Sequence, residues 1–443
     1  MLNDSNNAKD KNYSSNKIIS IEKQNPLEIN KFSPLQETTT FFSYEPKNNK
    51  ENEKEENNEK PVNMTINIIN NQYIYQQYNP FINMQFLYYY HTPSELFFDM
   101  LTKEINNYCN FTYKNIEYLN TIRIKYLKKI ENLIKTGLEK KYKIKFGHYG
   151  SYFTNLSIEG SDLDILVFYK PNNPNFDFLK DIIDLLNNHE KEFECIHPIL
   201  SASVPVIKLQ FNISNEIDHK IIQFLPYYGY KDISHIKIDL TFTFDENEFK
   251  RPDQIVTYIN KKNEEYPNIK PLLLVLKRYF RIMKMNKSFT GGLSSHSLFL
   301  LVLAFLKNNP LLNSSQFSLG KSLYFSLEKY SFFDYNNYGI DVEGPQLYYL
   351  LKENLNFVFN DYENRREEIN IIDPFTKINV AKSSFQVDEI KNTFNKALFF
   401  FKFEAWKYDS NNYQTYNNTN NLTIIDNNKE NDFIIIKKFF SIK

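Results

Sequence analysis

The segment FGHYGSYFTNLSIEGSDLDILVF, residues 146–168, decides the fold expected of this chain. It holds Gly147, Gly150 and Gly160, although the chain has only 10 glycines in 443 residues. Glycine permits tight turns and close approach of the backbone to a ligand. The concentration of glycine in a glycine-poor chain therefore marks this segment as a candidate binding turn.

Two aspartates follow this turn at the start of a predicted strand. Because side chains alternate along a strand, Asp162 and Asp164 project from one face and Leu163 from the other. Neighbouring carboxylates repel each other, and Mg²⁺ or Mn²⁺ is the natural partner for such hard oxygen ligands. A lone Asp-x-Asp also fits a simple surface charge, but the Gly150-Ser151 turn upstream, which could hold phosphate oxygens, favours the binding site.

A third carboxylate lies in the apolar alternation IKIDLTF, residues 236–242. There Asp239 projects opposite to the apolar side chains, which is unusual in a core-like strand. The alternative interpretation is an exposed edge, with Lys237 paired to a neighbour. Three carboxylates on adjacent strands could bind two metal ions, one activating an attacking hydroxyl and one holding a triphosphate.

The surrounding pattern predicts an α+β fold. Strands rich in β-branched and aromatic residues are predicted at 143–147, 163–169, 204–211 and 236–244, with a helix near 176–187. Apolar periodicity predicts a helix along 116–134 and further helices at 270–283, 294–307, 344–354 and 386–401. A capping box of Thr92, Pro93 and Glu95 predicts that the first helix begins there, and 433–440 is predicted as a strand.

Composition limits the function classes. Lys+Arg and Asp+Glu both total 53, which argues against nucleic-acid binding through a dominant basic field. Two cysteines, Cys109 and Cys195, favour a reducing compartment, and both are predicted to be core thiols. The apolar run 298–306 is too short to span a membrane. The Asn- and charge-rich segment 1–92 is predicted to be a disordered tail.

Residues 146–168 together with Asp239 resemble the signature of the DNA polymerase β-type nucleotidyltransferase superfamily. Residues 271–306 and 371–398 resemble the non-canonical poly(A) polymerases, particularly the branch found in TRAMP-type RNA-surveillance complexes. The resemblance implies a nucleotidyltransferase catalytic domain with a short mixed sheet and a mostly helical central (poly(A) polymerase-associated) domain. The expected ranges are 110–248 for the first, 93–109 with 249–405 for the second, and a partly disordered C-terminal segment, 406–443.

The resemblance also implies roles for individual residues. Metal ligands and catalytic groups are Asp162, Asp164 and Asp239, with Asp239 helping to deprotonate the RNA 3′-hydroxyl. Nucleotide-binding residues are Gly150, Ser151, Lys277, Arg281, Ser295 and His296. Lys277 and Arg281 lie four apart on one helical face and could both reach the outgoing phosphates; the alternative is a solvated cationic face.

Two positions depart from the pattern of the relatives. His296 stands where many relatives have Tyr, and it is expected to stack on the base over a smaller area. Asn155 stands where glycine is usual, which is tolerable because asparagine enters left-handed conformations at low cost.

The implied function is template-independent addition of AMP from ATP to RNA 3′ ends by a two-metal mechanism, with Mg²⁺ or Mn²⁺ as cofactor. Uridylyltransferase relatives commonly select uracil with a histidine after the central helices; this chain has none beyond His296. The alternatives are a terminal uridylyltransferase, an inactive scaffold of the same fold and an enzyme acting on small molecules. Expected partners are the RNA 3′ end, a zinc-knuckle protein and a helicase, with no membrane; the nucleus is the favoured compartment, with the cytoplasm open.

Overall fold

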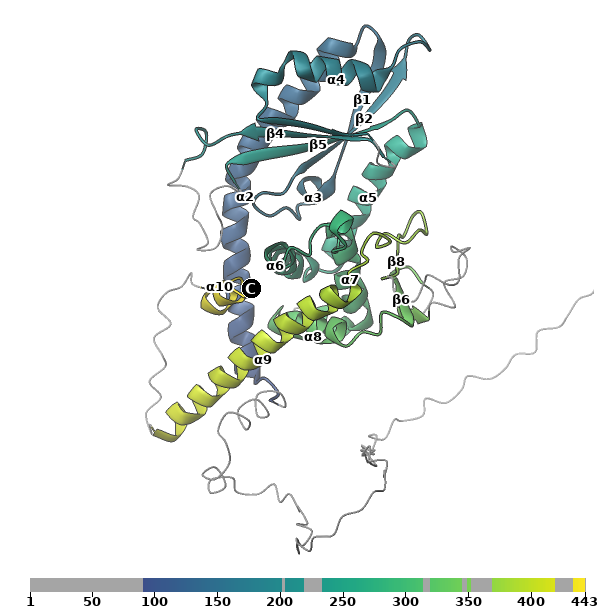
Figure 1. Cartoon of the computed structure of the whole chain (residues 1–443). Helices are drawn as coiled ribbons and strands as arrows, with labels where there is room; N and C mark the ends of the chain where they lie inside the picture. The colour runs from purple at the N-terminus through teal and green to yellow at the C-terminus, as the bar shows by residue number, and fades with distance from the viewer. Residues whose placement is uncertain are drawn as a thin grey trace, which may run out of the picture. The chain divides into compact units, whose positions relative to one another are not determined.

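The computed structural model describes residues 91–200, 204–218, 233–313, 319–344, 349–351, 369–418 and 433–442. All of them fall in one compact unit, Tyr73–Lys443. The predicted disordered tail lies outside the described residues except for His91 and Thr92. Figure 1 shows a sheet with a set of helices below it.

The sheet has five strands in the order β1-β2-β5-β4-β3, where β2 and β5 are parallel and the other neighbours antiparallel. The strands are β1 Tyr142–Tyr149, β2 Leu163–Pro171, β3 Cys195–Ile199, β4 Val206–Asn212 and β5 His235–Thr243. A mixed sheet of this kind confirms the predicted α+β class. β3 was not predicted.

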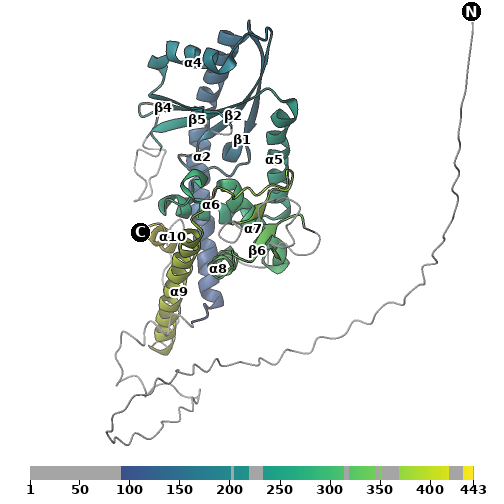
Figure 2. The ribbon, with the colours of Figure 1, turned by 45° about the vertical axis from the view of Figure 1, so that its right-hand side comes forward.

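One face of the sheet packs against the C-terminal half of α2 (Glu95–Leu138) and against α4 (Phe178–Asn188). Ile165 and Leu240 on the strands are fully buried there, with Ile130 of α2 and Ile182 of α4. Figures 1 and 2 show α4 on one side of the sheet and α6 (Ile269–Ile282) on the other. The second face therefore looks toward the helices.

Helix α2 is continuous over 44 residues, whereas the sequence predicted two helices. The residue that caps it is Ser94, whose Oγ accepts a hydrogen bond from Phe97 N, and not Thr92. Its first half contributes to a core formed by the helices, and its second half to the core under the sheet. The proposed boundary at 109/110 thus falls inside a helix whose apolar stripe serves both cores.

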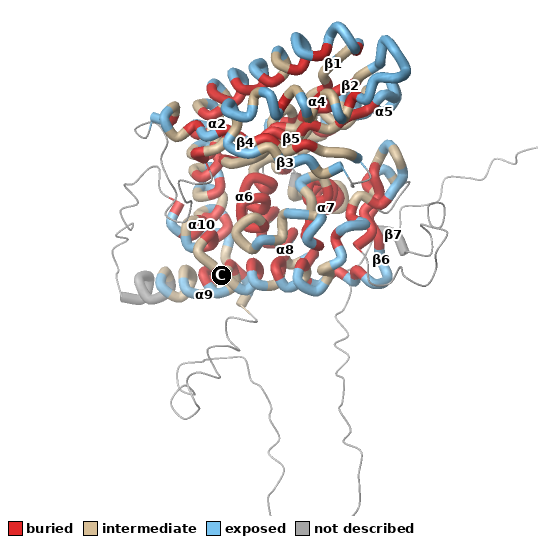
Figure 3. Tube along the Cα trace, turned by 45° about the horizontal axis from the view of Figure 1, so that its top comes forward, coloured by how far each residue is buried: buried red, intermediate tan, exposed pale blue. Residues whose placement is uncertain are grey.

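The remaining helices, apart from the short one at Gly150–Phe153, contribute to the helical core. They are α3 Gly150–Phe153, α5 Glu246–Glu265, α7 Ser295–Asn308, α8 Leu319–Ser331, α9 Val387–Asn418 and α10 Ile434–Phe439, with 3-10 turns at Glu190–Glu192, Ser288–Thr290 and Pro310–Asn313. A small second sheet joins β6 Tyr338–Asp341, β7 Tyr349–Leu351 and β8 Ile371–Ile372. Figure 3 shows α6 and α7 buried along most of their length, as their nearly unbroken apolar sequences require.

Several predictions fail here. The helix expected at 344–354 is wrong where the structure describes it, because Tyr349–Leu351 is a strand. The strand expected at 433–440 is the helix α10, and α9 continues to Asn418 inside the segment predicted to be partly disordered. Cys109 is buried as expected, but Cys195 is exposed on the outer strand β3. Among the described residues, no helix has the length and apolarity to cross a membrane.

Candidate active site

The three predicted aspartates lie at one end of the parallel strand pair. Asp164 on β2 is in direct register with Asp239 on β5. Asp239 is partly exposed while its neighbours Ile238 and Leu240 are fully buried, so the alternation predicted from the sequence holds. Asp162 precedes β2 by one residue.

The carboxylates interact electrostatically with one another. Burial, and then the proximity of Asp239 and Asp162, raises the pKa of Asp164 to about 7. Burial and then Asp239 also raise the pKa of Asp162. Asp164 is thus repelled by Asp162 and Asp239, and Asp162 by Asp239, and a bound cation would relieve that repulsion.

A lysine from the next strand reaches into this cluster. Lys208 on β4 is in register with Asp239, and its Nζ contacts the Asp239 carboxylate. The alternative interpretation of the sequence paired Lys237 with a neighbour, whereas Asp239 forms its ion pair with Lys208. Within the residues that the structure describes, no three carboxylate, imidazole or thiol side chains are arranged closely enough to hold a metal ion.

The Gly150-Ser151 turn packs against the same carboxylates. Tyr149 at the end of β1 is in register with Asp164, and the short helix α3 begins at the next residue. Gly150 has a φ of 78°, and a Cβ there would overlap the Asp164 carboxylate. Only glycine allows this approach. Ser151 is partly exposed beside it, and Asn155 adopts a φ of 55°, the left-handed conformation expected of that substitution.

Lys277 and Arg281 of α6 point at the loop between α3 and β2. Lys277 Nζ donates to Leu156 O at 2.6 Å, and Arg281 Nη1 donates to Glu159 O at 2.9 Å. Lys277 is only 7% exposed, which rules out a solvated cationic face for it, and burial lowers its pKa to about 7 against the opposing effect of Asp164. In this structure these cations bind loop carbonyls close to Asp164.

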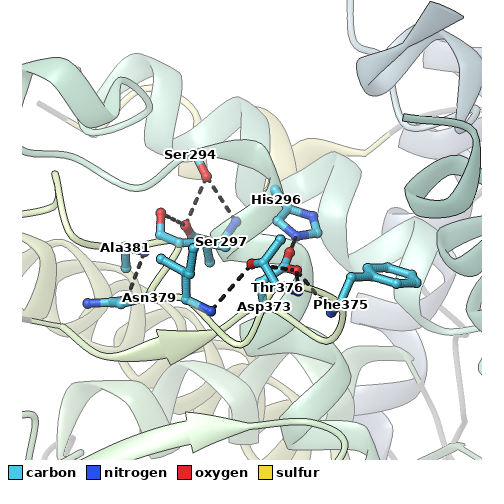
Figure 4. A network of polar contacts seen from close by, with 10 residues as sticks. Ser294, His296, Ser297, Asp373, Phe375, Thr376, Asn379 and Ala381 are labelled. Atoms are coloured by element: carbon cyan, nitrogen blue, oxygen red, sulfur yellow. Dashed lines mark hydrogen bonds and ion pairs between the residues drawn. The ribbon is translucent and has the colours of Figure 1, made fainter. Parts of the chain in front are cut away.

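The start of α7 forms a separate polar network (Figure 4). Ser294 caps the helix by accepting a hydrogen bond from Ser297 N, and Ser295 is exposed at its first position. His296 Nε2 lies 3.3 Å from Asp373 Oδ2, and its ring is nearly parallel to that of Phe299, at 11°. His296, the residue expected to stack on a base, is therefore anchored by an acid.

Asp373 was not singled out from the sequence. Its Oδ1 accepts hydrogen bonds from Phe375 N at 2.9 Å and from both the amide and the hydroxyl of Thr376. Although burial opposes it, these bonds and the one from His296 lower the pKa of Asp373 to about 2. The signal available in the sequence was an acidic residue directly before proline inside the resembling segment 371–398, a combination that favours a turn.

One hollow formed by the described residues lies elsewhere. It measures about 390 Å³ and is lined by Phe168, Tyr169, Lys170, Pro171, Phe244 and Glu246. These residues lie at the end of β2 away from Asp164. A nucleotide between the sheet and the helices stays a prediction.

Comparisons with known proteins add independent information. Residues 101–245 match the domain family described as "Poly(A) RNA polymerase, mitochondrial-like, central palm domain". The chain is 26% identical over 295 residues to poly(A) RNA polymerase gld-4 of Caenorhabditis elegans, covering 64% of this chain and 31% of that protein. It is 28% identical over 258 residues to the inactive non-canonical poly(A) RNA polymerase protein Trf4-2 of Drosophila melanogaster, covering 56% of each.

Poly(A) RNA polymerase cid14 of Schizosaccharomyces pombe is 27% identical over 257 residues, which are 56% of this chain and 33% of that protein. The match thus spans between about a third and just over half of the length of these curated relatives. Among solved structures, the polymerase core of TRAMP, an RNA surveillance complex, aligns with a TM-score of 0.50 at 21% identity, covering 65% of this chain and 81% of that one. That likeness shows the polymerase-core fold.

Proposed function

We propose that the chain is a nucleotidyltransferase of the non-canonical poly(A) polymerase family and that it adds AMP from ATP to RNA 3′ ends, in line with its similarity to members of that family. The observation that carries the proposal is the register of Asp164 with Asp239 on parallel strands, with the Gly150 backbone against Asp164. This arrangement gathers repelling carboxylates beside a turn whose backbone N–H groups and Ser151 hydroxyl could hold phosphate oxygens. Such a site is suited to phosphoryl chemistry.

In the proposed reaction the RNA 3′-hydroxyl oxygen attacks the α-phosphorus of ATP. The bond from that phosphorus to the bridging oxygen breaks, and pyrophosphate leaves with the electron pair. Asp239 accepts the hydroxyl proton in this scheme, and Gly150 and Ser151 orient the triphosphate. Lys277 and Arg281 are now bound to the loop carbonyls, but Lys277 interacts electrostatically with Asp164 and Arg281 with Asp162. After a change of side-chain conformation, both would serve the departing phosphates.

Asp162, Asp164 and Asp239 are the residues that would hold Mg²⁺ or Mn²⁺. The donor set fits hard divalent cations, because it consists of carboxylate oxygens. Burial, and then the charge of neighbouring carboxylates, raises the pKa of Asp162 and Asp164. When bound, such ions supply charge stabilisation to the triphosphate and acidify an attacking hydroxyl. For this, Asp239 has to exchange its contact with Lys208.

The test is a tailing assay with the purified full chain, an oligo(A) primer, Mg²⁺ and each nucleoside triphosphate supplied alone. We expect extension with ATP, and no extension by the variant with Asp162→Ala and Asp164→Ala. A preference for UTP would replace adenylation by uridylylation, which the missing later histidine makes the less favoured alternative.

A second candidate, an inactive scaffold, draws on two observations: the ion pair between Lys208 and Asp239, and the similarity to a relative that is itself called inactive. Against it stands the retention of all three aspartates together with the left-handed Gly150 turn. Tailing that survives replacement of Asp162 and Asp164 would come from a contaminant and would favour the scaffold.

The proposal extends to partners and compartment. Because Lys+Arg and Asp+Glu are equal in number, we infer that the chain grips RNA weakly alone. A zinc-knuckle RNA-binding protein and a helicase, as in TRAMP-type complexes, would supply that grip, and the nucleus is the proposed compartment. Adding such a partner to the tailing assay should raise activity; strong processive tailing by the isolated chain would contradict this.

A further inference from the structure

The loop between α3 and β2, residues 154–162, carries the first metal-binding candidate at its end. It belongs by sequence to the sheet, but Leu156 and Ile158 are buried in the core formed by the helices, at 5% and 3% exposure. The loop is therefore anchored in the helical core at one end and leads directly to Asp162 and Asp164 at the other. Whatever fixes this loop also fixes the aspartates.

A buried ion pair is the central contact of the anchor. Glu159 pairs with Arg278 of α6, and their side chains are only 4% and 1% exposed. The other Glu159 oxygen accepts a hydrogen bond from Asn115 Nδ2 of α2 at 2.9 Å. Because a charged pair is costly to bury, its presence here calls for a role beyond filling space.

The C-terminal helix completes the surroundings of Arg278. The guanidinium carbon lies 5.4 Å from the centre of the Tyr108 ring and 5.8 Å from that of Phe440, which is 3% exposed and follows α10 directly. Phe439 stacks on Tyr279, the next residue of α6, with ring centres 4.3 Å apart. Phe439 and Phe440, at the end of α10, therefore pack against Tyr279 and Arg278 of α6.

We propose that Glu159 and Arg278 are positioning residues for the aspartate cluster, and that α10 keeps Arg278 aimed at the loop. Phe440 and Tyr108 fix the guanidinium, the guanidinium fixes Glu159, and Glu159 fixes the turn that precedes Asp162. The catalytic part of this inference rests on the proposed function. The coupling of α10 to the loop through Arg278 does not.

Hydrogen exchange of the full chain tests, without reference to activity, whether α10 and Arg278 hold the loop in place. The amide of Leu156 donates a hydrogen bond to Ser151 O of α3, and the amide of Ser161 donates one to Ile158 O within the loop. Phe440→Leu and Arg278→Met should each raise exchange at these amides on the order of tenfold. Lys438→Ala is the matched control: it removes the ion pair of α10 with Glu404, 3.4 Å away, and should leave the loop unchanged.

Kinetics separate positioning from stability. Arg278→Met alone leaves Glu159 as an unpaired buried charge, so it should lower both Tm and kcat. The double variant Glu159→Leu with Arg278→Met replaces the pair by apolar side chains and should recover Tm. It should keep kcat lowered on the order of tenfold or more with the primer KM little changed, because the loop has lost its directional contacts.

Two results would overturn the inference. One is unchanged exchange at Leu156 and Ser161 in both Phe440→Leu and Arg278→Met. The other is a double variant that recovers kcat together with Tm, which would make the pair a stabilising contact only. If the wild-type chain shows no tailing at all, the proposed function fails. The exchange measurement still decides whether α10 holds the loop in place through Arg278.

Discussion

Asp164 on β2 and Asp373 after β8 are acidic side chains of the same chain with opposite surroundings. Asp164 faces two further carboxylates, and its pKa rises to about 7. Asp373 accepts hydrogen bonds from His296, Phe375 and Thr376, and its pKa falls to about 2. The Asp164 charge destabilises its site in the absence of a bound cation, whereas the Asp373 charge accepts the hydrogen bonds that stabilise a turn. In this chain the poorly compensated charge lies in the candidate active site, and the compensated charge has a structural role.

The largest effect is expected on tailing activity at Asp164, whose charge is poorly compensated. Replacing Asp164 by Asn should reduce tailing about 10³-fold or more, because an essential carboxylate is lost. Folding stability should stay level or rise, because a repelling charge is removed. Primer extension and urea denaturation measure the two quantities. A variant that is both active and less stable would mean that Asp164 serves the fold.

The next effect concerns the turn that touches Asp164. Gly150→Ala forces a Cβ into the Asp164 carboxylate at a positive φ, so tailing should fall about 10- to 100-fold, with a stability loss of about 1–2 kcal/mol. Gly147→Ala on β1 is the control, since the nearest atom to its Cβ would be in the Phe249 ring at 3.2 Å, with Leu166 at 3.7 Å. Equal losses in the two variants would show that the closeness of Gly150 to Asp164 is irrelevant.

On the compensated side, Asp373→Asn should cost about 2 kcal/mol of folding stability at pH 7. The folded pKa of Asp373 lies below its ordinary value of 3.8, so its contribution is present above about pH 4 and is lost as the pH falls toward 2. Denaturation of both proteins across this range should show their difference shrinking with acid. A difference in folding stability that does not change with pH would show that the Asp373 charge is not its cause.

The smallest effect concerns Lys208, the cation that already offsets Asp239. Lys208→Met should strengthen apparent Mg²⁺ binding about tenfold, because a competing and repelling charge is lost. Mg²⁺-dependent thermal stabilisation measures this directly. Lys143→Met, an exposed change on β1 at the end away from Asp164, is the control. No difference between the two variants would indicate that Lys208 and the cation do not share Asp239.

Much of the fold was predictable because its signals are local. The strands around Ile165 and Leu240 and the helices α6 and α7 follow from apolar periodicity, and their positions agree with prediction to within a few residues; α9 begins where predicted but continues to Asn418. The errors occurred where periodicity is silent: Ser94 caps α2 in place of Thr92, and the apolar run before Phe440 forms a helix where a strand was expected. A short apolar run fits either element until its packing partner is known.

The sequence by itself determined which face of its strand each of Asp164 and Asp239 occupies, because strand alternation is a property of neighbouring residues. The tertiary structure alone decided which partner each charged side chain meets. Lys208 reaches Asp239 across 31 positions of sequence, His296 meets Asp373 across 77, and Arg278 meets Glu159 across 119. Such contacts depend on how separate elements pack, which no local period encodes.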